Sequence, residues 1–125
     1  METKLTLALR RSFMVLAGFL GALGVASAAA ASHGSDVRNV AAISTIALAH
    51  APVLLLLALV GRGRALVAAG VILSIGVTLF TADLAMRQWV GAPLFPGAAP
   101  IGGGALIVGW IVMAISAAFR SSFNN

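Results

Sequence analysis

The sequence contains no cysteine, and only three of its 125 residues are acidic: Glu2, Asp36 and Asp83. The lack of cysteine excludes disulfides, thiolate metal sites and a cysteine nucleophile. Charged residues make up 9% of the chain, whereas a typical soluble domain has about 25%. Hydrophobic residues make up 61%, which is more apolar surface than a soluble fold of this length can bury. We therefore expect lipid to be the main solvent of the folded chain.

Four apolar runs are each long enough to cross a bilayer. A hydrocarbon core about 30 Å thick requires roughly 20 residues in a helix. The predicted spans cover residues 12–31, 40–60, 65–84 and 101–119. Backbone polar groups in lipid must be satisfied within each segment, so runs of this length are expected to be helices. The sequence predicts an all-α integral membrane protein, a four-transmembrane-helix bundle that forms one domain over residues 1–125.

The basic residues lie at the ends of the apolar runs and predict the orientation of the bundle. One side would carry Lys4, Arg10, Arg11, Arg62, Arg64 and Arg120, and the other Arg38 and Arg87. The positive-inside rule then places both termini and the GRGR turn in the cytoplasm. The net charge of +5 is explained by this asymmetry, so no nucleic-acid partner is expected.

The first apolar run has a second interpretation. The stretch LRRSFMVLAGFLGALGVASAAAAS has a basic start, an apolar middle and an alanine-rich end, as a secretory signal peptide does. We favour a first transmembrane helix, because the apolar run is long enough to span the membrane.

Small residues repeat every four positions in the spans and are predicted to mark the packing faces. Apolar side chains gain little by leaving lipid for another helix, so membrane helices associate through close backbone contact. The predicted packing residues are Gly18, Ala22, Gly70, Ser74, Gly102 and Gly109. Pro100 is predicted in the first turn of the last helix, where a missing N–H costs nothing.

Asp83 lies near the outer end of the third span, four residues before Arg87. An acid and a base at this spacing face the same side of a helix, which favours an ion pair at the membrane boundary. A contact with a partner protein, together with the neighbouring Trp89, and a proton or ion site remain as alternatives, because intramembrane carboxylates are often functional.

His50 and Thr78 are the candidate buried polar residues within the spans. A neutral imidazole at His50 can donate to a carbonyl across a helix seam, and Pro52 is expected to kink the helix just after it. His33 falls at the outer face, too far in depth to share a metal ion with His50. We therefore predict no cofactor, no metal site and no catalytic residue.

Several motifs resemble a family of small membrane proteins, the domain-of-unknown-function 423 family, which is related to transmembrane protein 256. APIGGGALIVGW is similar to the family's TPIGG and GW signature, and GALG with SHG to its GALG and GAHG. AHA around His50 is similar to its YHALALL, and LFTADLAM to its LFSGSLYxL. The resemblance implies four helices and an inner-membrane location, but no activity. TAD replaces SGS in this chain, so Asp83 cannot be carried over from the family.

These observations favour a non-enzymatic accessory subunit that packs against a larger membrane complex, such as a respiratory or quinone-linked oxidoreductase, in a bacterial-type inner (plasma) membrane. The alternative is a small ion or solute transporter or channel, formed by a homo-oligomer, that uses Asp83 and His50 with Thr78 along its path. A buried partner contact at Asp83 would support the first hypothesis, and polar groups converging on a mid-membrane cavity would support the second.

Overall fold

The computed structural model describes residues 2–119, and every regular element in this range is helical. The α-helices are α1 (Lys4–Ala31), α2 (Arg38–Val60), α3 (Arg64–Trp89) and α4 (Ala98–Ile115), and the short 3-10 helix η1 (Ser116–Ala118) continues α4. Four helices, counting α4 with η1, are long and apolar enough to cross a membrane. The chain is therefore an all-α protein of the multi-pass membrane type. Arg120, which was counted among the basic residues of one end, lies outside the described residues.

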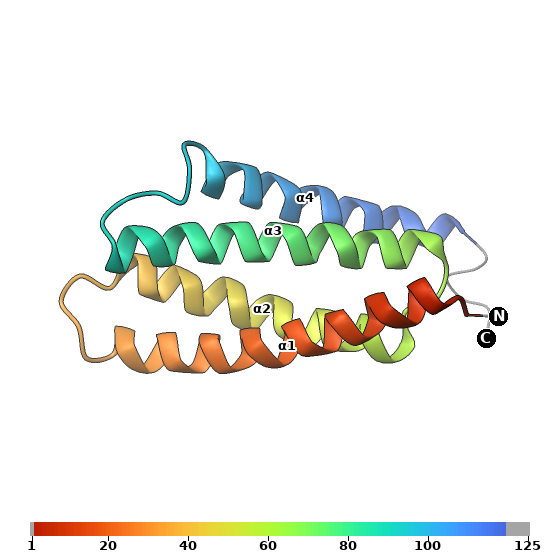
Figure 1. Ribbon diagram of the computed structural model, residues 1–125, viewed down its shortest axis with the longest axis horizontal. Helices are drawn as coiled ribbons and strands as arrows, with labels where there is room; N and C mark the ends of the chain where they lie inside the picture. The colour runs from red at the N-terminus through yellow and green to blue at the C-terminus, as the bar shows by residue number, and fades with distance from the viewer. Residues whose placement is uncertain (1, 120–125) are drawn as a thin grey trace.

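The helices form two antiparallel hairpins that lie side by side (Figure 1). The most extensive contacts are those within the hairpins, between α1 and α2 and between α3 and α4. The two hairpins meet mainly through α2 and α3, with a smaller contact between α1 and α3. Helix α4 thus lies at one edge and packs mainly on α3, which makes the bundle open on that side.

Two helices extend well beyond the predicted spans. Helix α1 begins at Lys4 rather than near residue 12, and the side chain of Thr3 caps it by accepting from the amide of Thr6 at 3.1 Å. Its 28 residues rise about 42 Å at about 1.5 Å per residue, which exceeds a hydrocarbon core of about 30 Å. Helix α3 likewise continues to Trp89, so the basic ends of both helices reach past the apolar region.

One proline lies inside α2 and another lies at the start of α4. Pro52 lies inside α2, and the helix continues through it. Gly97 precedes α4 with a left-handed φ of 87°, which favours glycine, and Pro100 lies in the first turn of α4. This turn aims α4 back along α3.

The buried face of α1 differs from the predicted one. Gly18 and Ala22 are exposed, and a Cβ added at Gly18 would meet no atom within 4 Å. The packing glycine of this helix is Gly24, where a Cβ would lie 2.5 Å from Cγ of Leu48 in α2. Ser44 of α2 also donates to the Gly24 carbonyl oxygen at 2.8 Å. The prediction for Gly18 and Ala22 is wrong because small residues occupy both faces of α1. The lipid-facing side of this helix is as apolar as the packed side, so polarity does not show which side is buried.

Helices α3 and α4 approach each other through glycines on both sides. A Cβ at Gly102 would lie 2.7 Å from the amide nitrogen of Phe80 and 2.9 Å from the carbonyl oxygen of Gly76. A Cβ at Gly76 would lie 2.9 Å from the amide nitrogen of Leu106. Further along, Gly109 lies against the side chain of Leu73. Backbone therefore meets backbone along this seam, as expected where membrane helices associate through small residues.

The remaining packing residues lie on α3. Gly70 is buried against the ring of Phe13 from α1, where a Cβ would lie 2.6 Å from two ring carbons. Ser74 is only partly buried, and its hydroxyl donates to the Gly70 carbonyl of the same helix at 2.7 Å. Gly70 thus carries the contact between the two hairpins on this side of α3.

Arg10 fastens α1 to the end of α2. Its guanidinium donates to the carbonyl oxygens of Ala58 and Leu59, both at 2.7 Å, and forms an ion pair with Glu2. The last carbonyls of a helix have no partner within the helix and carry a partial negative charge. Arg10 therefore caps α2 from a neighbouring helix.

Candidate functional site

Asp83 lies six residues before the end of α3, on the side that faces the α3–α4 loop. Its carboxylate accepts from the Arg87 guanidinium at 2.8 Å through one oxygen and from the backbone amide of Leu94 at 2.7 Å through the other. The Asp83 side chain is 0% exposed, whereas that of Arg87 is 43% exposed. The predicted ion pair is present, and a second bond to the loop accompanies it.

Asp83 therefore holds the α3–α4 loop against the end of α3 through its hydrogen bond with the Leu94 amide. Both carboxylate oxygens accept hydrogen bonds within the chain, and the side chain is fully buried. This arrangement favours the ion pair over a partner contact at Asp83. Arg87 and Trp89, by contrast, are exposed at this end, and Trp89 is 62% exposed.

A second side chain of α3, that of Gln88, bonds to the other loop at this end of the molecule. Gln88 donates from Nε2 to the backbone oxygen of Asp36 at 3.1 Å, which joins α3 to the α1–α2 loop. Its Oε1 atom is buried and has no hydrogen-bond partner among residues 2–119. Both loops at this end are thus bonded to the last turns of α3.

His50 is buried in the middle of α2 and uses both ring nitrogens. Nδ1 lies 2.8 Å from the carbonyl oxygen of Ile46, and Nε2 accepts from Nε1 of Trp110 at 3.1 Å. Since a carbonyl only accepts, the neutral ring carries its proton on Nδ1. The two rings meet edge to face with centroids 5.8 Å apart. The carbonyl partner belongs to α2 itself, so the expected bond across a seam is made by Trp110 of α4 instead.

Thr78 is exposed rather than buried, which corrects the second candidate within the spans. The buried threonine of α3 is Thr81, whose hydroxyl donates to the Val77 carbonyl at 2.7 Å. His50 and Asp83 share no hydrogen-bond partner in the described part of the chain. The structure therefore does not bring the three candidates for a transport path together.

Metal-binding groups are not clustered in the described residues. No set of three or more His, Asp or Glu side chains within residues 2–119 is placed to hold a metal ion. His33 is exposed in the α1–α2 loop, away from the buried His50.

Comparison with known families shows to which family the chain belongs. A family model described as "Protein of unknown function (DUF423)" matches residues 17–103, more than half of the chain. The chain belongs to the DUF423 family. No solved structure matches it.

The DUF423 match includes most of the residues described above. It contains His50, Gly76, Asp83 and Gly102, and it ends just after the first two glycines of PIGGG. Trp110 lies beyond the matched residues, so the His50–Trp110 bond joins a matched helix to the last part of α4.

Sequence reasoning missed the long-range partners of these side chains. Trp110 and Leu94 are 60 and 11 residues away from His50 and Asp83, respectively. Gly109, which precedes Trp110, was among the predicted packing residues, but nothing in the local pattern indicated which helix would receive the indole. For Leu94, the only signal was the length of the loop.

Proposed function

We propose that this DUF423 protein is a non-catalytic accessory protein that packs against a larger membrane complex in a bacterial-type inner membrane. The observation that supports this function is the one-sided packing of α4. Its inner face lies on α3, while Ile101, Ile107 and Ile111 are more than half exposed on the outer face.

The outer face of α4 also has a flat position suited to helix contact. Gly104 is exposed, and a Cβ there would meet nothing within 4 Å. Helices in membranes associate where small residues let backbones approach closely. A transmembrane helix of the larger complex is the occupant that we propose for this face.

The internal polar groups favour this function over transport. His50 and Asp83 are held by bonds within the chain, and a transport path would require breaking them. A large multi-subunit assembly, such as a respiratory or quinone-linked complex, is the class of host that we propose. We propose, from the positive-inside rule, that the basic end of the bundle, where α1 begins, faces the cytoplasm.

The test is purification of the tagged, full-length protein from its native membranes in a gentle detergent, followed by mass spectrometry of the proteins that accompany it. Gly104→Leu is expected to remove a stoichiometric host. Gly18→Leu is the matched control, because Gly18 is also exposed with no atom within 4 Å of an added Cβ, but it lies on α1.

The outcomes separate the proposal from its alternatives. Recovery of the protein alone, as a homo-oligomer, would overturn the accessory function and favour the transporter. If Gly18→Leu loses the host and Gly104→Leu retains it, the host contacts α1 and the proposed contact on α4 is wrong. Substitutions at Gly70 or Asp83 are unsuitable probes, because both residues pack inside the chain.

A further inference from the structure

One end of the molecule gathers almost all of the unbalanced positive charge. This is the end where α1 begins and where α2 turns into α3 (Figure 1). Its basic residues among those described are Lys4, Arg10, Arg11, Arg62 and Arg64, and its acid is Glu2. The opposite end has two acids and two basic residues, namely Asp36, Asp83, Arg38 and Arg87. The excess of positive charge among the described residues therefore lies at one end of the molecule.

The single described acid at the basic end is already engaged. Glu2 forms its ion pair with Arg10, and the same guanidinium binds the last carbonyls of α2. Lys4, Arg11, Arg62 and Arg64 have no acidic partner within residues 2–119. Like charges held together at one end repel each other and attract anions from the surroundings.

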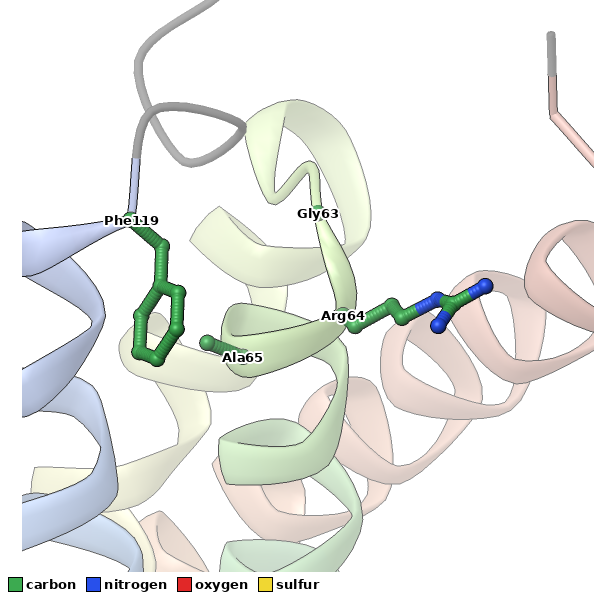
Figure 2. Close-up of a pocket in the computed structure, with 4 residues that line it drawn as sticks. All are labelled: Gly63, Arg64, Ala65 and Phe119. Atoms are coloured by element: carbon green, nitrogen blue, oxygen red, sulfur yellow. The ribbon is translucent and has the colours of Figure 1, made fainter.

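A pocket of about 500 Å³ opens beside these charges, at the start of α3. It is lined by Gly63, Arg64, Ala65 and Phe119. Figure 2 shows the Phe119 ring facing Ala65, whereas the Arg64 side chain extends from α3 toward α1. Helix α3 has no side-chain cap, so its first amides add partial positive charge to the same end. An apolar recess and a cationic surface thus adjoin.

We propose that this basic end binds the headgroup of an anionic phospholipid. The phosphate would lie beside the exposed basic side chains of the α2–α3 turn, Arg62 and Arg64, and an acyl chain would reach from there into the recess between Ala65 and Phe119. Because α1 is longer than the hydrocarbon core is thick and its charged residues lie in its first turns, this end would reach the headgroup region. Basic residues next to a membrane span are attracted to anionic lipids at this depth.

The position of the charges favours lipid over other polyanions. Arg62 lies in the short turn between α2 and α3, and Arg64 begins α3. In a bilayer spanned by these two helices, this turn would lie near the headgroups. The adjoining recess is apolar, which suits an acyl chain and offers nothing to a nucleic acid. This proposal does not depend on the accessory function, because a protein without any partner would retain the same lipid site.

The experiment is native mass spectrometry of the purified full-length protein with phosphatidylglycerol or phosphatidylcholine added at defined concentrations. The unmodified protein is expected to bind phosphatidylglycerol more tightly, with an affinity that falls as ionic strength rises. Arg62→Gln and Arg64→Gln should each weaken phosphatidylglycerol binding by about fivefold per charge. Arg64→Lys should largely retain it. Circular dichroism checks that each variant remains folded.

Arg38→Gln is the control, because Arg38 is an exposed arginine at the opposite end, and it should leave the affinity unchanged. Equal binding of both lipids by the unmodified protein would overturn the proposal, as would an equal loss in Arg38→Gln and Arg64→Gln. Capture of an acidic protein or a nucleic acid at this end, with no preference between the lipids, would also overturn it.

Discussion

Replacing Gly102 by alanine places one methyl group in the seam between α3 and α4. The new Cβ would lie 2.7 Å from the Phe80 amide nitrogen, 2.9 Å from the Gly76 carbonyl oxygen and 3.1 Å from the Phe80 Cα. All three atoms belong to the backbone of α3, so no side chain can turn aside and the helices must separate. Overpacking of this kind costs about 1–3 kcal/mol. The higher helix propensity of alanine offsets up to about 1 kcal/mol of that cost.

We therefore expect Gly102→Ala to lower the free energy of unfolding by up to about 2 kcal/mol, which is the cost of overpacking less about 1 kcal/mol of helix propensity. The assay is unfolding of the purified protein from a mild detergent by added dodecyl sulfate, followed by circular dichroism. Gly104→Ala is the matched control in the same helix, since its methyl group would meet nothing within 4 Å. A Gly102→Ala protein as stable as Gly104→Ala would refute the close approach of α4 to α3.

Two further predictions concern the polar side chains. In Asp83→Ala, the Leu94 amide loses the acceptor that it has at 2.7 Å, so its hydrogen exchange should become faster. In His50→Phe, Nε1 of Trp110 loses its acceptor at 3.1 Å. The emission of this indole should then shift to shorter wavelength, and the free energy of unfolding should fall by about 0.5–1 kcal/mol, as expected for a hydrogen bond between membrane helices.

The controls for these predictions come from residues at the surface. Asp36→Ala removes an exposed carboxylate of the same end, and it should leave exchange at Leu94 unchanged. Trp89→Phe provides a background in which Trp110 is the remaining tryptophan, because the chain has two. Unaltered exchange in Asp83→Ala, or unaltered Trp110 emission in His50→Phe, would contradict the hydrogen bonds described above.

The helices and their order follow directly from the sequence, because apolar length decides which segments can cross lipid. The Asp83–Arg87 pair is predictable for a similar reason, since it depends only on the geometry of one helix. The close contact at Gly102 is indicated by the glycines of PIGGG. These features are local, and local patterns are sufficient to predict them.

The faces of the helices are harder to predict. In water the polar side of a helix shows where solvent lies, but in lipid both sides are apolar. Gly18 and Gly24 are therefore alike in the sequence, although the first is exposed and the second is packed against Leu48. Trp110 is similarly ambiguous, because its partner His50 belongs to another hairpin and no spacing rule connects them.

The pairing of the helices into two hairpins has a consequence for the order of assembly in time. The most extensive contacts join helices that are consecutive in the chain, α1 with α2 and α3 with α4. During synthesis, the first hairpin can complete its main interface before α3 and α4 have left the ribosome. Contacts between neighbours in sequence also form quickly, because little chain must be brought together. The docking of the two hairpins along α2 and α3 is then a separate step, and the bond from Trp110 to His50 can form only in that step, because the two residues belong to different hairpins.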